Sequence, residues 1–259
     1  MKQQYDISYS KIDLEIRKID VFLPDDNANG AAILFIHGGG WSGGNRRQWH
    51  AVMEHFCGLG YVCASAGYHL LPDYHFPAQY DDVRLAMSWF KARADEFAFD
   101  PGRVATWGSS SGGHLAALLA VTDPSDDLGM SDEIAHRDTR AAAAVCYCTI
   151  FSLHRKEGYY KTDFLGGAEE EDAPSLYRDA SPIDHVCGGE PPFIMITGKA
   201  DQTTPIAWHE AMKEKLEAHG GSAELHILPG VEHGFGYGMY SDEQKTAAAH
   251  AETFLARVL

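Results

Sequence analysis

Ser110 is the residue whose neighbours most resemble those of an activated nucleophile. It has glycine two positions before it, at Gly108, and two positions after it, at Gly112. A serine on a sharp turn between a strand and a helix has strained backbone angles, and glycines at these positions remove the Cβ atoms that would collide. Ser109 and Ser111 lack this pair of glycines. The spacing therefore predicts that Ser110 lies on such a turn, at the positive end of a helix, and acts as a nucleophile.

Asp201 and His233 are the candidates for the acid and the base that a nucleophilic serine needs. Asp201 comes shortly after an apolar run at 193–197, and His233 comes shortly after a strand-like run at 223–228. We expect His233 to take the proton of Ser110. We expect Asp201 to hold the imidazole in the correct tautomer.

Two other carboxylates, those of Asp184 and Glu232, are rivals for the role of the acid. Asp184 precedes the strand-like run at 193–197, so it would lie at the opposite end of that strand from Asp201. Glu232 is adjacent to His233, so its side chain would point elsewhere. The apolar run at 141–150 ends without a carboxylate, which further favours Asp201.

Three glycines follow His37 and lead to Trp41. Bare backbone in such a loop can approach a substrate oxygen closely, so we expect the backbone N–H groups of Gly39, Gly40 and Ser111 to stabilise an oxyanion. His37 is expected to brace this loop through hydrogen bonds and not to take part in the chemistry.

Aromatic and histidine side chains near these segments have more than one interpretation. Trp41, Phe235 and Tyr237 either line a substrate pocket or pack beside it. His114 is expected to pack behind the serine turn, and His209 is expected to lie on the surface of a helix.

Strand-like and helical patterns alternate along the chain. Strands are predicted at about residues 5–9, 14–23, 31–36, 61–66, 104–107, 141–150, 193–197 and 223–228, and helices at about 45–56, 78–97, 115–121, 205–219 and from 241 onward. This alternation predicts an α/β fold with a mostly parallel sheet and helices on both faces, whose catalytic groups lie at the carboxyl ends of the strands. We expect one domain over residues 1–259, in which 151–190 forms either a lid or a surface helix with a loop.

Local signals add further expectations. The phase of the alternation changes between Ile16 and Ile19, which indicates a β-bulge. Thr204 is expected to cap a helix that has Pro205 at its first position. Ser241 and Gln244 have the spacing of a capping box.

Cys146 and Cys148 would face the same side of a strand, and we interpret them as core residues and not as a metal site. The five cysteines are an odd number and mostly lie in apolar surroundings, which favours a reducing, cytoplasmic environment.

Composition excludes several classes of partner. The chain has 259 residues with 21 basic and 37 acidic side chains, a net charge of −16, so binding to nucleic acid or to an anionic membrane surface is not expected. No apolar run approaches the ~20 residues of a membrane-spanning helix, and the N-terminus lacks the apolar core of a signal peptide. The sequence indicates no cofactor and no metal, and it leaves the oligomeric state open.

Together these segments resemble the α/β-hydrolase fold, in which serine, acid and histidine follow in this order along the chain. The stretch from His37 to Trp41 is similar to that of the hormone-sensitive-lipase-like esterases. The segments at 164–167, 181–184 and 191–193 are more similar to the small esterases described as acetyl-xylan and feruloyl esterases.

The resemblance implies a serine carboxylesterase whose partner is a small-molecule ester. It covers roughly residues 20–259. Only 32 residues precede Ile33, so the helical cap of the hormone-sensitive-lipase-like enzymes is expected to be reduced. A more open site would favour short acyl groups, such as acetyl groups on sugars. His69 stands where an arginine is usual in that family, which puts a structural arginine in doubt but not the chemistry.

Two other functions remain open at this point. Arylformamidases, which hydrolyse N-formylkynurenine, carry a similar glycine loop and a similar triad. A binding protein built on a hydrolase scaffold is the other alternative, but such proteins typically lose one of the three triad residues, and all three are present here.

Overall fold

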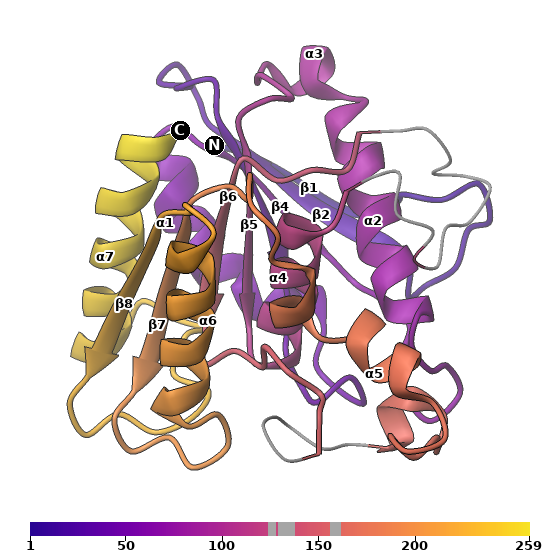
Figure 1. Ribbon diagram of the computed structural model, residues 1–259. Helices are drawn as coiled ribbons and strands as arrows, with labels where there is room; N and C mark the ends of the chain where they lie inside the picture. The colour runs from indigo at the N-terminus through magenta and orange to yellow at the C-terminus, as the bar shows by residue number, and fades with distance from the viewer. Residues whose placement is uncertain (124–127, 129–137, 156–161) are drawn as a thin grey trace.

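Eight strands form one sheet at the centre of this computed structural model, which describes residues 1–123, 128, 138–155 and 162–259 (Figure 1). The strands are β1 (Lys2–Ser8), β2 (Lys18–Leu23), β3 (Ala32–Ile36), β4 (Val62–Ala66), β5 (Val104–Ser109), β6 (Ala143–Tyr147), β7 (Phe193–Gly198) and β8 (Ala223–Leu228). Their order across the sheet is β1-β2-β4-β3-β5-β6-β7-β8. The pairs β1–β2 and β2–β4 are antiparallel, and all other pairs are parallel. The predicted mostly parallel sheet is confirmed.

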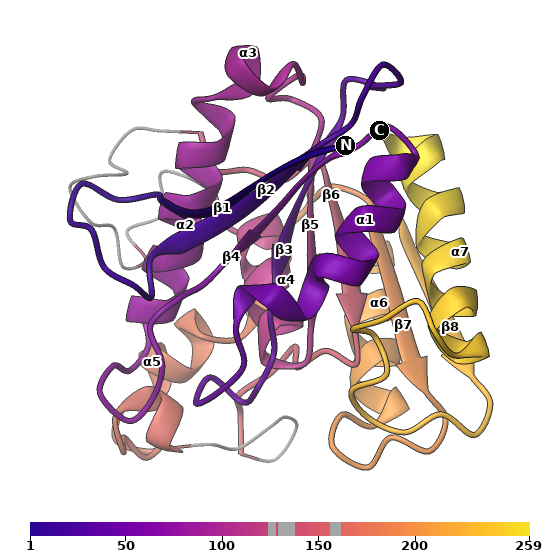
Figure 2. The ribbon, with the colours of Figure 1, turned by 180° about the vertical axis from the view of Figure 1, so that it is seen from behind.

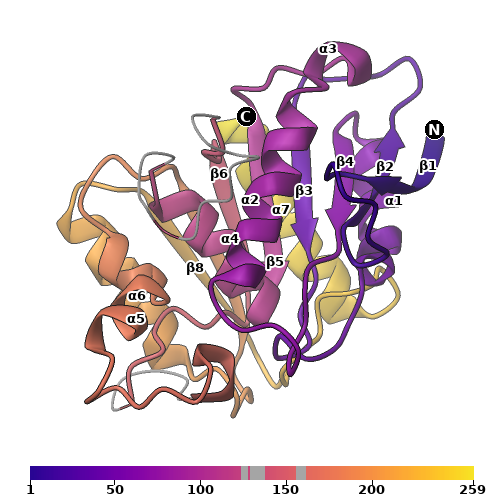
Figure 3. The same ribbon diagram turned by 90° about the vertical axis from the view of Figure 1, so that its right-hand side faces the viewer.

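Helices cover both faces of this sheet. They are α1 (His50–Gly58), α2 (Ala78–Lys91), α3 (Ala94–Phe97), α4 (Ser111–Val121), α5 (Pro174–Asp179), α6 (Ile206–Ala218) and α7 (Asp242–Val258), with 3₁₀ helices η1 (Arg46–Trp49), η2 (Thr162–Leu165) and η3 (Pro182–His185). Figure 1 shows α2, α4 and α6 on one face, and the view from behind in Figure 2 shows α1 and α7 on the other. The view in Figure 3 shows the loops at the carboxyl ends of the strands gathered at the lower rim.

Burial of the central strands explains their sequences. Every residue of β3, β4, β5, β6 and β7 is buried. A strand covered on both faces needs apolar residues at every position, which gives continuous and not alternating hydrophobic runs. Two apolar cores result, one on each face of the sheet. The sheet is therefore a rigid support for the loops at its rim.

The beginning of the chain differs from the prediction. The register shift lies in β1, between Gln4 and Ile7, where Asp6 adopts a φ of 56°. The β-bulge expected between Ile16 and Ile19 is therefore misplaced. The change of phase in the sequence marks the start of β2 at Lys18, because the residues before it are not in a strand.

The helix predicted over 78–97 is two helices, α2 and α3. The backbone of Arg93 is not helical, at φ −110° and ψ 17°, and α3 ends at once because Ala98 adopts a left-handed φ of 59°. The guanidinium of Arg93 lies 4.0 Å from the ring centre of Trp89. Apolar residues of both helices, including Phe90 and Phe97, are buried in the same core.

Cys146 and Cys148 are both buried, as expected, but they do not lie on the same face of the sheet. Cys146 belongs to the core on the α4 side of the sheet and Cys148 to the core on the α7 side. The reason is that Cys148 lies just beyond the end of β6 and adopts a φ of 45°, which ends the alternation of a strand. All five cysteines of the chain are free thiols.

No helix among the described residues is both long enough and apolar enough to cross a bilayer.

The segment predicted as a possible lid is partly described. Residues 156–161 lie outside the described residues, and the rest contains η2, α5 and η3. His154 ties its parts together, since its Nδ1 lies 2.6 Å from Glu170 Oε1 and its Nε2 lies 2.6 Å from Asp184 Oδ2. Two carboxylates on one imidazole require a proton on each nitrogen, so this bridge needs the charged ring. Partial burial opposes that charge, but the carboxylates of Asp184 and Glu170 raise the pKa of His154 overall.

The bridge should therefore depend on pH. A raised folded-state pKa means that the bridge is complete below the unfolded value of about 6.5 and is lost as the pH rises through the folded-state pKa. We expect hydrogen exchange at residues 165–185, corrected for its intrinsic pH dependence, to accelerate between neutral and alkaline pH. The variant His154→Gln should exchange rapidly at every pH. The same pH dependence in both proteins would show that the bridge does not hold this segment.

Candidate active site

Ser110 lies on a strained turn between β5 and α4. Its backbone adopts φ 56° and ψ −123°, and its N–H donates to Tyr147 O at 2.9 Å. A Cβ atom on Gly108 would lie 2.1 Å from Gly112 O, and one on Gly112 would lie 2.2 Å from Ile36 O. Backbone thus packs directly on backbone around the serine, as the spacing of the glycines predicts.

The structure brings Ser110, His233 and Asp201 into one chain of hydrogen bonds. Ser110 Oγ lies 2.9 Å from His233 Nε2, and His233 Nδ1 lies 2.8 Å from Asp201 Oδ2. The residues come from three loops that follow β5, β7 and β8, so the carboxyl edge of the parallel sheet is what assembles them. This arrangement lets the imidazole accept the serine proton while the carboxylate holds its tautomer.

Asp201 is fully buried and has three other hydrogen-bond donors. Its carboxylate accepts from Thr203 N at 2.7 Å, Thr204 N at 2.9 Å and Thr204 Oγ1 at 2.7 Å. Burial opposes ionisation, but the hydrogen bonds from His233 and Thr204 outweigh it and hold the pKa of Asp201 well below its usual range. The acid is therefore ionised at neutral pH.

The expected helix cap at Thr204 is wrong. Pro205 is the N-cap residue of α6, with an extended backbone at φ −54° and ψ 148°, and the helix starts at Ile206. The Thr204 hydroxyl bonds to Asp201 instead. A sequence shows that a threonine precedes a proline but not which oxygen its hydroxyl will reach.

Two carbonyl groups of the loop from His37 to Trp41, here called the glycine loop, accept hydrogen bonds from residues in or next to the loop. His37 Nδ1 donates to Gly38 O at 3.0 Å, and Gly39 O accepts from Ser42 N at 3.2 Å and Gly43 N at 3.1 Å. The C=O and N–H of a trans peptide point in opposite directions. The Gly39 N–H, which shares a peptide with the Gly38 carbonyl, therefore points away from the His37 ring.

This loop lies directly against the serine turn. A Cβ on Gly38 would lie 3.3 Å from Ser110 Cβ. Gly39 and Gly40 adopt φ values of 123° and 61°, which favour glycine. The Ser111 N–H is at the first position of α4 and has no partner within the helix. Their positions are compatible with the predicted oxyanion donors, whose role remains a prediction.

His37 is a bracing residue, as expected. Its ring is fully buried and stacks on Tyr68 with centroids 4.3 Å apart. Burial lowers the pKa of His37 to about 4, so the ring is neutral and its Nδ1–H remains a donor near neutral pH. His114 packs behind the serine turn, also as expected, with Nε2 2.6 Å from Ala180 O.

His209 was expected on a helix surface, and this is wrong. The side chain is fully buried, accepts from Thr149 N at 3.0 Å and meets Phe151 edge-on. Burial lowers the pKa of His209 to about 4. The loop that follows β6 covers this face of α6, and the sequence does not reveal that contact.

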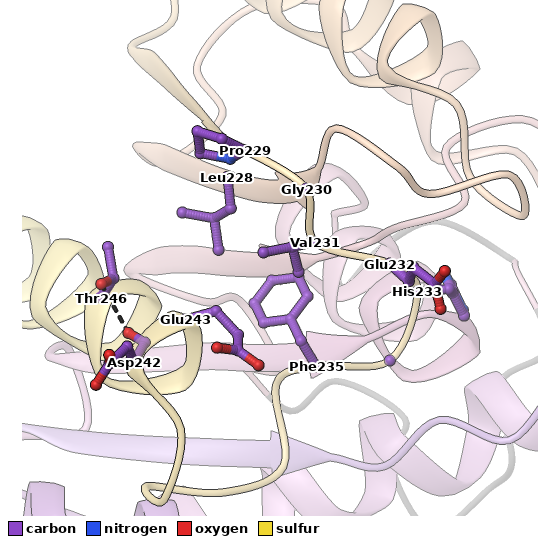
Figure 4. Close-up of a pocket in the computed structure, with 11 residues that line it drawn as sticks. Leu228, Pro229, Gly230, Val231, Glu232, His233, Phe235, Asp242, Glu243 and Thr246 are labelled. Carbon is purple, nitrogen blue, oxygen red and sulfur yellow. Dashed lines mark hydrogen bonds between the residues drawn. The ribbon is translucent and has the colours of Figure 1, made fainter.

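Trp41 and Phe235, two of the aromatic candidates for lining a substrate pocket, lie in different environments. Trp41 is fully buried and stacks on Phe164 with centroids 4.1 Å apart, which favours the packing interpretation. Phe235 lines a hollow of about 660 Å³ beside the His233 loop. Figure 4 shows Glu232 and His233 at one end of this hollow and the start of α7 at the other. Ser110 is not among the described residues that line it.

Neither rival acid contacts the imidazole of His233 through a described hydrogen bond. Asp184 bonds to His154, and the exposed Glu232 lines the hollow.

Cys148 is a neighbour of the triad that sequence reasoning missed. Its Sγ, a carboxylate oxygen of Asp201 and a ring nitrogen of His233 lie within 4.8 Å of one another. Such donors can hold a metal, but thiolate ligation needs a deprotonated sulfur. Burial raises the pKa of Cys148 to about 12, so the thiol is protonated. The Asp201–His233 hydrogen bond fits a carboxylate that orients an imidazole base better than it fits a metal site.

Comparisons with known proteins agree with this geometry. A family model named BD-FAE matches residues 19–216. The chain belongs to the BD-FAE family. It is similar to the probable carboxylic ester hydrolase LipM of Mycobacterium tuberculosis, with 32% identity over 98% of this chain and 61% of LipM. Esterase LipC of the same organism is 31% identical over 78% of this chain and 52% of LipC. The chain thus spans between half and two thirds of the length of these curated relatives.

Solved structures resemble the whole BD-FAE chain. An esterase from Thermogutta terrifontis with butyrate bound is 26% identical, with a TM-score of 0.83 over 98% of this chain and 94% of its own. A truncated carbohydrate esterase from gut microbiota has a TM-score of 0.83 at 22% identity, over 99% of this chain and 96% of its own. The fold is that of the α/β hydrolases, as predicted.

The contacts of the glycines predict the effect of one added methyl group. Gly108→Ala places its Cβ 2.1 Å from a backbone oxygen that cannot rotate away, so the turn must open. A displacement of about 1 Å at the nucleophile costs on the order of a hundredfold in rate. We expect hydrolysis of p-nitrophenyl acetate by Gly108→Ala to fall at least that far. Gly58→Ala is the matched control, because its Cβ meets nothing within 4 Å. Equal rates for both variants would contradict the tight turn.

Proposed function

We propose that this chain is a serine carboxylic ester hydrolase with Ser110, His233 and Asp201 as its catalytic triad. The supporting observation is the unbroken hydrogen-bond chain from Ser110 Oγ through both imidazole nitrogens to the buried carboxylate. A non-catalytic binding protein would have no need to keep this strained serine and this buried charge together. Esterase activity in relatives of similar sequence and fold points in the same direction.

The reaction follows from the positions of the three groups. Ser110 Oγ attacks the ester carbonyl carbon while its proton moves to His233 Nε2. The backbone N–H groups of Gly39, Gly40 and Ser111 stabilise the oxyanion. The tetrahedral intermediate then expels the alcohol, which takes the proton from His233. Water, deprotonated by His233, attacks the acyl-enzyme and releases the carboxylic acid, and Ser110 recovers its proton.

We further propose that the substrates are esters of short acyl groups such as acetyl, with acetyl or feruloyl esters of carbohydrates as the candidate natural substrates. The esterase from Thermogutta terrifontis has been solved with butyrate and with propionate bound. Membership of the BD-FAE family supports carbohydrate esters. The net charge of −16 disfavours anionic substrates. The physiological partner is therefore proposed to be a neutral small-molecule ester.

Labelling of the nucleophile tests the triad. The Thermogutta terrifontis enzyme has been seen phosphorylated by paraoxon. We expect paraoxon to add one diethylphosphoryl group to this protein and none to Ser110→Ala, measured by intact mass. Ser110→Ala should also lose about a million-fold in kcat, as other triads do. Ser109→Ala, which changes the neighbouring serine, should still be labelled. Labelling of Ser110→Ala would contradict the assignment.

A substrate panel tests the proposed specificity. It contains p-nitrophenyl esters from acetate to decanoate, acetylated xylan, a feruloylated sugar and N-formylkynurenine. We expect kcat/KM to be highest for acyl chains of two to four carbons and to fall steadily beyond them. A preference for N-formylkynurenine over every ester would identify an arylformamidase. A preference for decanoate would contradict the short-chain proposal.

A further inference from the structure

The peptide group that joins His37 to Gly38 lies between two tyrosine hydroxyls. Tyr68 donates its hydroxyl hydrogen to His37 O at 2.8 Å. On the opposite edge of the same peptide, Gly38 N–H donates to the Tyr237 hydroxyl oxygen at 2.7 Å. Both polar atoms of one peptide plane are therefore held by side chains.

The two tyrosines come from distant parts of the chain. Tyr68 lies in the loop after β4, and Tyr237 lies in the loop after β8, four residues beyond His233. Both rings are fixed by packing. Tyr68 is buried and stacks on the His37 ring with an interplanar angle of 12°, and the centroid of Tyr237 lies 4.7 Å from that of Trp49. Their hydroxyls therefore occupy defined positions.

Glycines cannot set the direction of these peptides by themselves. Gly38 has no side chain, and there is no room for one, because a Cβ atom there would lie 2.4 Å from the Tyr237 hydroxyl oxygen. Glycine backbone has access to many conformations, so contacts from outside must select one. The next two peptides are held through the carbonyl groups of Gly38 and Gly39, by His37 Nδ1 and by the turn at Ser42. Among the described residues, the two tyrosines are the groups that hydrogen-bond to the first peptide.

We propose that Tyr68 and Tyr237 form a hydroxyl clamp on the His37–Gly38 peptide, and that Tyr237 is a positioning residue which aligns the oxyanion loop with the loop that carries His233. The clamp fixes the orientation of the His37–Gly38 peptide plane. The next peptide, which carries the Gly39 N–H, is built on that plane. No described acceptor in the protein takes up that N–H, so its direction matters for an oxyanion. The inference rests on the proposed function, because it assigns a role within that reaction.

The chemistry of the hydroxyls suits a permanent clamp. Burial raises the pKa of Tyr237 to about 12 and raises that of Tyr68 further above its ordinary value. Both phenols therefore stay protonated at any pH at which the protein would work. A phenolate at Tyr68 would lose the hydrogen that it donates to His37 O.

Removal of one hydroxyl tests the clamp. Tyr237→Phe keeps the ring on Trp49 and removes the hydroxyl that accepts from the Gly38 N–H and lies beside Ser109. We expect kcat for p-nitrophenyl acetate to fall about 10- to 100-fold, because loss of alignment at an oxyanion donor costs up to the value of the donor itself. KM should change by less than about twofold, because the ester ground state carries no oxyanion.

A transition-state analogue separates positioning from mere folding. A trifluoromethyl ketone forms an oxyanion on Ser110, so its inhibition constant should weaken by the same factor as kcat/KM falls. The acid limb of the pH–rate profile should stay at its wild-type position, because the contacts of His233 are not altered.

Two further variants complete the test. Tyr240→Phe is the matched control, since it removes a hydroxyl three residues away on a side chain that is 81% exposed, and it should keep wild-type kcat. Tyr68→Phe should resemble Tyr237→Phe, and the double variant should lose less than the product of the two losses, because both hydroxyls act on one peptide.

The outcomes distinguish failure of the clamp hypothesis from failure of the proposed esterase function. Wild-type kcat and wild-type affinity for the trifluoromethyl ketone in Tyr237→Phe, with only a lower melting temperature, would overturn the clamp and leave the triad intact. If Tyr237→Phe fails to fold, the same two measurements on Tyr68→Phe decide. A wild-type protein that neither hydrolyses esters nor reacts with paraoxon would instead contradict the proposed function.

Discussion

Contact of bare backbone with bare backbone around Ser110 is the constraint on which the rest of the site depends. The turn has no room for a side chain at Gly108 or Gly112, because neighbouring carbonyl oxygens occupy that space. This contact forces the serine into a positive φ and holds it at the N-terminus of α4. The glycine loop lies directly against this turn, where the proposed oxyanion donors would reach the same substrate carbonyl.

The parallel sheet brings residues that are far apart in the sequence close together in space. Ser110 and His233 are 123 residues apart, yet their loops leave the same edge of the sheet and their side chains are hydrogen-bonded. Asp201 is placed there by the strand between them. The charge of this buried carboxylate is stabilised by hydrogen bonds from His233 and from Thr203 and Thr204 in its own loop. Rigid strands and short loops are sufficient to assemble the three residues.

Residue spacing predicted the fold and the positions of the three central residues, because glycine placement and continuous apolar runs reflect local sterics and burial directly. Contacts between loops were not predictable in the same way. His209 is covered by a loop that follows another strand, and Thr204 turns its hydroxyl to Asp201 and not to a helix. Cys148 leaves the strand pattern because of a single backbone angle. These outcomes depend on three-dimensional neighbours that a one-dimensional pattern does not specify.

Complete burial of α4 has a consequence for how this protein can diverge. All eleven residues of this helix, from Ser111 to Val121, are buried. A change of side-chain volume at any of them disturbs the packing beneath the nucleophile, so this helix accepts volume-conserving substitutions best. Larger changes of sequence are tolerated more easily in the loops at the rim. The esterase from Thermogutta terrifontis has a similar architecture at 26% identity.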